Sequence, residues 1–177
     1  MSNSRLSWRE YALGLAESAS LRSEDPYLKV GACALSHKKM VVGVGYNGLA
    51  SNKDVESEDF WTDRNQRRKY MIHAEVNCLS LCKKGEVALL AVTLSPCSHC
   101  ATMIAAYDIP LVVYRDEYKR DRAESIFDFY GIALIHLPSR EERDKICPSL
   151  PLSTPTSSSL SDPKQINIPE DGQFRTE

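Results

Sequence analysis

Residues 89–100 read LLAVTLSPCSHC, an apolar run that ends at a proline and is followed by two cysteines three positions apart. The run is short and rich in leucine and valine, so it predicts a buried β-strand over residues 89–95. Pro96 suits the first turn of a helix, which indicates a helix beginning at about Cys97. Because positions three apart share one helix face, Cys97 and Cys100 are expected to point the same way.

The same alternation of strand and helix extends to both sides of this unit. Helices are predicted at 73–83, 97–107 and 120–130, and strands at 89–95, 111–116 and 133–138. This alternation indicates parallel strands joined by crossover helices. Upstream, the β-rich runs 28–36 and 40–48 are separated by HKK and predict an antiparallel hairpin. The expected fold class is therefore α/β, with a central mixed five-stranded sheet flanked by helices.

Two other segments have different patterns. Ser7 followed by Glu10 is a capping-box signal, and apolar residues at helical spacing predict a helix that continues to about Leu21. Residues 49–70 are polar and aperiodic. This segment is too long for a simple turn, so we expect a functional loop that lies over a site.

Length and charge narrow the function classes. The chain has 177 residues and a formal net charge of -2, so one folded domain is expected and no global basic field recruits nucleic acid or an anionic membrane. The N-terminus lacks the pattern of a secretory leader, and no apolar run reaches about eighteen residues. We expect a soluble protein of the cytoplasm. Six cysteines in a chain of this length are too few for a disulfide scaffold, so a close pair favours metal binding or catalysis.

The C-terminal part has a different composition. Residues 148–163 contain twelve Pro, Ser or Thr in sixteen positions. Such a segment cannot bury enough apolar surface to offset the entropy of ordering the chain. We therefore expect a folded domain over residues 1–139 and a disordered tail over residues 140–177.

Four side chains indicate a reaction centre. Cys97 and Cys100 lie where a helix N-terminus stabilises thiolates, and His73 lies where polar sequence gives way to another helix. If the two helices pack side by side, their N-termini meet at the edge of the sheet that usually binds ligands. Three ligands leave one position of a tetrahedral zinc site for water, which is the pattern of a catalytic site. Glu75, two residues after His73, is then expected to carry protons between that water and a substrate.

The residues by themselves leave other uses of this motif open. A lone Cys-x-x-Cys also occurs in redox proteins. A structural zinc site needs a fourth ligand, for which the sequence offers His99 or Cys82. His99 is sterically awkward between the two cysteines, and Cys82 lies about 13 Å beyond His73 by helix rise. The remaining cysteines, Cys33, Cys78 and Cys147, are expected to be structural thiols.

The combined motif resembles a known family. H-x-E at 73–75 followed by P-C-x-x-C at 96–100 is the signature of the zinc-dependent cytidine and deoxycytidylate deaminase superfamily, and the resemblance extends from about Leu6 to Leu137. Three further stretches resemble the deoxycytidylate (dCMP) deaminase branch, namely RSEDPYLKVGA (22–32), GVGYNG (43–48) and YRDEY (114–118). The related transfer RNA adenosine deaminases usually have glutamate where this chain has Ser95. The resemblance implies a three-layer cytidine-deaminase-like fold and the deamination of dCMP to dUMP, which supplies thymidylate synthesis.

The resemblance also implies roles for individual residues. His73, Cys97 and Cys100 match the ligands of one Zn2+ per subunit, and Glu75 matches the proton shuttle. Asn47 matches an asparagine near the sugar, and Tyr118 matches an aromatic residue close to the nucleotide. Lys119 and Arg22 are candidates for contact with the 5′-phosphate. A turn role for Asn47 and a packing role for Tyr118 stay open, because Asn-Gly is also a turn signal.

Family members are typically homohexamers that dCTP stimulates and dTTP inhibits, the triphosphate binding with Mg2+. Gly45, Tyr46 and Gly48 resemble part of that effector site, although a strand that ends in a turn needs the same glycines. Some relatives hold a second, structural zinc through Cys and His in the insertion after YNG. Residues 49–70 contain neither, so one zinc is expected.

Three competing functions differ in what they require. A deaminase that flips a base out of RNA or single-stranded DNA needs a basic, aromatic-rich channel, which the net charge of -2 disfavours. Another cytosine nucleotide or free cytidine is a second possible substrate. A non-catalytic protein that binds zinc or nucleotide for assembly is the third reading. The basic run RNQRRK (64–69) offers cations to a phosphate, but such runs are also typical of solvated faces.

Overall fold

A computed structural model describes residues 5–50, 57–118 and 123–138. Its helices are α1 (Trp8–Ser20), α2 (Glu58–Thr62), α3 (Arg64–Tyr70), α4 (Ala74–Leu79), α5 (Ser98–Ala106) and α6 (Glu124–Tyr130). Its strands are β1 (Gly31–Ser36), β2 (Val41–Tyr46), β3 (Val87–Leu94), β4 (Leu111–Asp116) and β5 (Ala133–His136). The sheet has the order β2-β1-β3-β4-β5. Strand β1 pairs antiparallel with β2 and β3, whereas β3, β4 and β5 are parallel.

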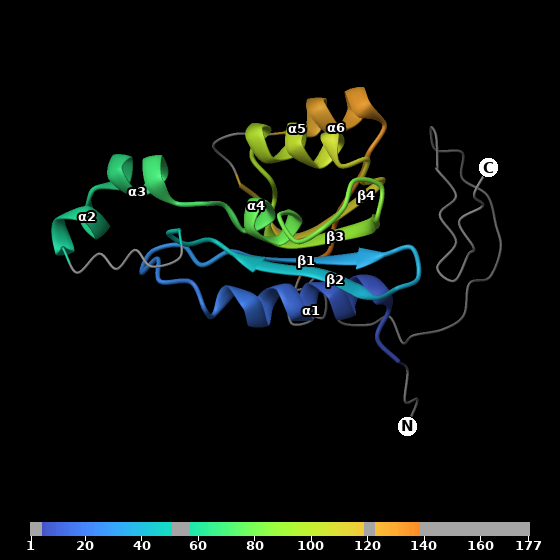
Figure 1. Ribbon diagram of the computed structural model, residues 1–177, viewed down its shortest axis with the longest axis horizontal. Coiled ribbons are helices and arrows are strands. Elements are labelled where there is room, and N and C mark those ends of the chain that lie inside the picture. The colour runs from blue at the N-terminus through green and yellow to red at the C-terminus, as the bar shows by residue number, and fades with distance from the viewer. Residues whose placement is uncertain (1–4, 51–56, 119–122, 139–177) are drawn as a thin grey trace, which may run out of the picture. The chain divides into compact units, whose positions relative to one another are not determined.

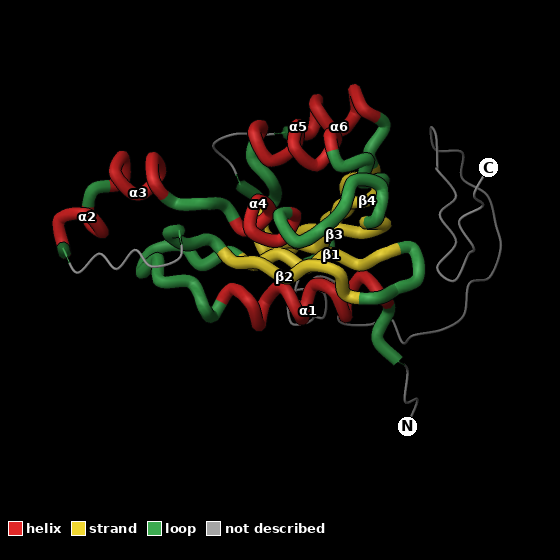
Figure 2. Tube along the Cα trace, in the orientation of Figure 1, coloured by secondary structure: helices red, strands yellow, loops and turns green. Residues whose placement is uncertain are grey.

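The molecule has three layers. Helix α1 covers one face of the sheet, and α4, α5 and α6 cover the other (Figure 1, Figure 2). Neighbouring residues in the central strands therefore enter different cores. In β1, Ala32 and Ala34 join the core beneath α4, α5 and α6, while Cys33 and Leu35 join the core beneath α1. Because both faces are covered, the central strands read as continuous apolar runs. The predicted mixed five-stranded sheet with flanking helices is confirmed.

The start of α1 is built as its sequence predicts. The Ser7 side chain accepts a hydrogen bond from the Glu10 backbone N–H, and the Glu10 carboxylate accepts one from the Ser7 backbone N–H at 2.9 Å. This reciprocal capping satisfies donors that have no partner inside the helix. Small residues then let the helix lie close to the sheet, since a Cβ at Gly31 would collide with the Ala16 carbonyl.

The prediction of a functional loop over residues 49–70 is wrong about the secondary structure of its second half. Residues 58–70 form the two short helices α2 and α3, separated by Asp63. The Asp63 carboxylate accepts hydrogen bonds from the N–H groups of Asn65 and Gln66, which fixes the start of α3. Neither helix buries a residue, so no apolar stripe marks them in the sequence.

Other boundaries differ by a few residues. Helix α4 ends at Leu79 rather than near residue 83, and α6 begins at Glu124. Residues 51–56 and 119–122 and the predicted tail lie outside the described residues. Within the described ranges, the helices are too short or too polar to cross a bilayer.

Candidate metal and catalytic centre

The position of His73 is fixed by the chain on both sides of it. Gly48 and Ile72 exchange two backbone hydrogen bonds of 3.0 and 2.8 Å, which ties the residue before His73 to the turn after β2. His73 is itself the N-cap residue of α4. On the next part of the helix, the Asn77 side chain donates a hydrogen bond of 2.8 Å to the Tyr46 carbonyl. These bonds connect the hairpin to the chain both before and after His73.

The two thiols are placed by the strand and helix that the LLAVTLSPCSHC stretch predicts. Strand β3 ends at Leu94, and Cys97 is the N-cap residue of α5. Cys100 follows in the first turn and is 2% exposed. Both thiols therefore lie at the carboxyl end of a parallel strand, where α/β folds bind ligands.

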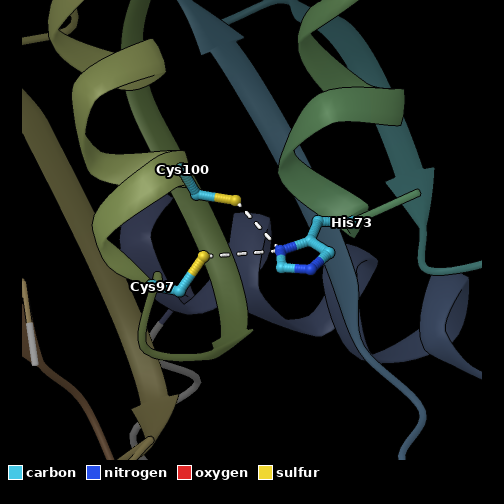
Figure 3. Close-up of side chains that lie close together, drawn as sticks. All are labelled: His73, Cys97 and Cys100. Atoms are coloured by element: carbon cyan, nitrogen blue, oxygen red, sulfur yellow. Dashed lines mark hydrogen bonds between the residues drawn. The ribbon is translucent and has the colours of Figure 1, made fainter. Parts of the chain in front are cut away.

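The three side chains converge on one point. The His73 Nδ1 atom lies 3.3 Å from the Cys100 sulfur and 3.5 Å from the Cys97 sulfur (Figure 3). All three possible ligand atoms lie within 4.8 Å of one another. Neither His99 nor Cys82 belongs to this cluster of described residues.

The cluster has the dimensions of a zinc site. Zinc binds imidazole nitrogen at about 2.0–2.1 Å and thiolate at about 2.3 Å, so a tetrahedral arrangement separates nitrogen from sulfur by about 3.5 Å. The two observed nitrogen to sulfur distances, 3.3 and 3.5 Å, match this value. Three ligands from the described residues leave one corner of the tetrahedron for solvent or substrate.

The hydrogen bonds within the cluster shift the pKa values of its two thiols in opposite directions. The Cys100 thiol and His73 donate to Cys97 and lower the pKa of Cys97 to about 4. The pKa of Cys100 is raised because it donates that hydrogen bond and because it is buried. The hydrogen bond to Cys97 also raises the pKa of His73, against the effects of burial and of the positive charge of Arg68. The cluster already stabilises one thiolate, the form of cysteine that a metal binds.

Glu75 lies in the first turn of α4 and is 4% exposed. Burial raises the pKa of its carboxyl group, because a charged carboxylate is poorly solvated there. The carboxyl group lines the same pocket as the three possible ligands. A carboxyl group that holds its proton more tightly than usual is suited to proton transfer.

A pocket of about 990 Å³ opens at this cluster and is large enough for a nucleotide. Asn47 lines it, and its amide accepts a hydrogen bond from the Val30 N–H at 2.7 Å and donates one to the Leu28 carbonyl at 2.8 Å. The amide still has one hydrogen and one lone pair for a ligand. Tyr118 also lines the pocket, where its backbone N–H donates to the Ser95 hydroxyl at 2.7 Å.

The basic residues that line the pocket differ from those predicted to bind the phosphate. Arg22 is exposed and is not part of the pocket lining, and Lys119 lies outside the described residues. The lining instead includes Arg64, Arg67 and Arg68 of α3. The run RNQRRK is therefore more than a solvated face, although its sequence left both readings open.

A partly buried ion pair at the pocket was not identified from the sequence. Arg67 Nη1 lies 3.0 Å from the Asp25 carboxylate, and the Arg67 guanidinium lies 4.2 Å from the centre of the Tyr27 ring. The stretch RSEDPY contains Asp25 and Tyr27, but no local spacing signals a partner 42 positions later.

The glycines of the GVGYNG stretch have packing roles. A Cβ at Gly45 would lie 2.4 Å from the Cys78 backbone nitrogen, so the glycine lets α4 approach β2. Gly48 pairs with Ile72 and faces the Glu24 carboxylate. Gly45, Tyr46 and Gly48 do not line the pocket. Their proposed role in effector binding stays a prediction.

Comparisons with known proteins agree with this geometry. Residues 6–116 match the family model described as the cytidine and deoxycytidylate deaminase zinc-binding region. The deoxycytidylate deaminase of Pongo abelii is 32% identical over 139 residues, which cover 72% of this chain and 78% of that protein. The deoxycytidylate deaminase of Mycobacterium phage D29 is 35% identical over 129 residues, covering 64% of this chain and 98% of that protein.

A solved structure has the same fold. The dCMP deaminase from the cyanophage S-TIM5, in complex with dCMP and dUMP, matches with a TM-score of 0.61 and 28% identity. The match covers 72% of this chain and 95% of that chain. It confirms the three-layer fold that the sequence predicts.

Proposed function

Because this chain belongs to the cytidine and deoxycytidylate deaminase family, we propose that it catalyses the zinc-dependent hydrolysis of dCMP to dUMP and ammonia. One observation carries the proposal. His73, Cys97 and Cys100 converge with the spacing of zinc ligands, and a buried carboxyl group, Glu75, lines the same pocket. This arrangement supports hydrolysis, because it places a metal position with an open corner beside a group that can move protons.

In this proposal His73, Cys97 and Cys100 hold the ion, and Glu75 moves the protons. A zinc ion bound there would supply an activated water as the nucleophile for carbon 4 of cytosine. Glu75 takes a proton from the attacking water and delivers it to ring nitrogen 3. It then takes the remaining hydroxyl proton and delivers it to the amino group, which leaves as ammonia. One carboxyl group thus serves both steps.

We assign the orientation of the substrate to Asn47 and Tyr118. Asn47 is 7% exposed and is fixed by hydrogen bonds to the backbone of the 28–30 segment, so its free donor and acceptor have a defined direction. Tyr118 is half-buried in the pocket lining. Side chains held in place before binding reduce the entropy cost of orienting the nucleotide.

The test is the loss of cytosine absorbance when purified protein is mixed with dCMP. We expect activity from the wild type and a loss of at least about 1,000-fold in Glu75→Gln, because the amide cannot carry protons. The zinc content should stay near one per chain in this variant, since Glu75 is not a ligand. Glu124→Gln, which changes an exposed carboxylate of α6, is the matched control. Equal rates in the wild type and Glu75→Gln would reject the assignment.

We further propose the regulation that the family resemblance implies. The enzyme would be a cytoplasmic homohexamer that supplies dUMP for thymidylate synthesis, is activated by dCTP and is inhibited by dTTP with Mg2+, with Gly45, Tyr46 and Gly48 near the effector. Sigmoidal dependence of rate on dCMP that becomes hyperbolic with dCTP would support this proposal. A rate that responds to neither triphosphate would contradict it.

A further inference from the structure

Three arginines lie on one face of helix α3. Arg64, Arg67 and Arg68 are separated by three and four positions, which places their side chains on the same side of a helix. All three line the pocket that contains His73 and Glu75. The charge of Arg68 acts on the His73 imidazole, so this face of α3 lies within electrostatic range of the metal site.

The central arginine is already engaged. Arg67 donates to the Asp25 carboxylate at 3.0 Å, and its side chain is only 12% exposed. The same Asp25 oxygen accepts hydrogen bonds from the backbone N–H groups of Tyr27 and Leu28. Arg67 therefore neutralises a buried carboxylate and fixes α3 against the 25–28 segment. Its contact with the Tyr27 ring, at 4.2 Å, adds to this attachment.

The charges of the other two arginines, Arg64 and Arg68, are not neutralised by a described acidic side chain. Both are exposed, and within the described ranges neither forms an ion pair. Once Asp25 and Arg67 neutralise each other, the remaining charges of the lining away from the metal cluster are Arg64, Arg68 and the exposed Glu117. The part of the pocket lining that α3 contributes is thus positively charged, although the whole chain has a net charge of -2.

We propose that Arg64 and Arg68 bind the 5′-phosphate of the nucleotide substrate, with Arg67 as the positioning residue that holds α3 at the pocket. The inference rests on the proposed deamination of dCMP, and it adds the phosphate subsite. A phosphate monoester has a charge of about -1.5 to -2 near neutral pH, and the planar guanidinium donates two parallel hydrogen bonds to its oxygens. The subsite therefore selects nucleotides over nucleosides.

The proposal is tested by comparing ligands with and without the phosphate. Calorimetry gives the affinity of dUMP and of deoxyuridine, and steady-state kinetics give kcat/KM for dCMP and for deoxycytidine. In Arg64→Gln and in Arg68→Gln, we expect the preference for nucleotide over nucleoside to fall by roughly 10- to 100-fold in both measurements, the value of one charge-assisted hydrogen bond. The double variant should lose more. Lys69→Gln, which removes the same charge from an exposed residue of α3 outside the pocket lining, should keep the wild-type preference.

The outcomes separate this inference from the proposed function. A wild type that deaminates neither dCMP nor deoxycytidine refutes the function, and the dUMP and deoxyuridine affinities still decide the role of the arginines. If the arginine variants lose nucleotide and nucleoside affinity equally, or if Lys69→Gln loses the same preference, the phosphate subsite is wrong. An unchanged preference in the double variant refutes it as well.

Discussion

His73 and Cys97 are both N-cap residues, yet neither side chain makes a capping hydrogen bond. Serine or aspartate at such a position normally satisfies a free N–H of the first turn. Here the imidazole and the thiol are instead directed to each other at 3.5 Å. The side chains of these two N-cap residues therefore do not cap their own helices. Both remain available as metal ligands.

Cys33 belongs to the buried cysteines outside this cluster. It is 0% exposed, and burial, reinforced by Cys82, raises the pKa of its thiol from 9.0 to about 11. Below pH 9 the folded and unfolded chains both keep the proton, so the contribution of the thiol to stability is complete. As the pH rises towards 11, only the unfolded chain loses the proton, and stability falls.

We therefore predict a steeper alkaline loss of stability in the wild type than in Cys33→Ala. Between pH 9 and pH 11 the free energy of unfolding should fall by about 2 kcal/mol more in the wild type. Urea unfolding at a series of pH values measures this difference. Parallel pH profiles for the two proteins would mean that the Cys33 thiol titrates equally in both states.

At the scale of elements, the contact between α4 and β2 decides where the centre is built. Gly43 and Gly45 both point at the backbone of α4 near Cys78, and a Cβ at either position would lie within 2.6 Å of it. Without side chains there, the helix lies directly on the strand. His73 and Glu75 stand at the beginning of this helix, so the glycines position both groups.

Gly45→Ala should separate α4 from β2. We expect it to lower the free energy of unfolding by about 3 kcal/mol, because the new Cβ meets rigid backbone atoms. It should also reduce the zinc content. Gly14→Ala is the matched control, since nothing lies within 4 Å of that position in α1. Alanine there should raise stability by roughly 0.5 to 1 kcal/mol. Equal effects of the two substitutions, measured by chemical denaturation, would contradict the close contact.

Helices α2 and α3 were not predicted from the sequence, and their exposure explains why. Apolar periodicity arises only when one face of a helix is buried. Neither helix buries a residue, and α3 uses its inner face for arginines that line the pocket. The local signals for α3 are the capping residue Asp63 and the basic residues of the last turn.

At the scale of the whole molecule, the described fold ends shortly after β5. Among the described residues, the last to contact either core is Leu137, which packs against the core beneath α1. Its backbone N–H donates to the Tyr114 carbonyl at 2.8 Å. We therefore propose that the deaminase domain is contained in residues 1–139, as the sequence predicts.

A chain that ends at residue 139 is expected to fold, bind about one zinc ion and deaminate dCMP at a rate within about twofold of the full chain. The reason is that the candidate zinc ligands, the described core residues and the residues that line the pocket all precede that position. Thermal unfolding, metal analysis and the absorbance assay compare the two proteins. Loss of folding in the shorter chain would show that residues 140–177 contribute to the domain.

The features of this protein that depend on local pattern can be predicted from its amino-acid sequence. The capping box at Ser7, the strand and helix at 89–107 and the motif pair at 73–75 and 96–100 are signals read within a few residues. They give the α/β class, the candidate zinc ligands and the choice of zinc, because backbone hydrogen bonding and ligand chemistry act over short distances in the chain.

Only the tertiary structure decided the strand order, the convergence of the three ligand atoms within 4.8 Å and the arginines that reach the pocket. Each of these depends on contacts between segments far apart in the chain, such as the pair of Asp25 with Arg67. Local spacing does not encode such pairs, since they form only when the sheet and its two helical layers bring the segments together.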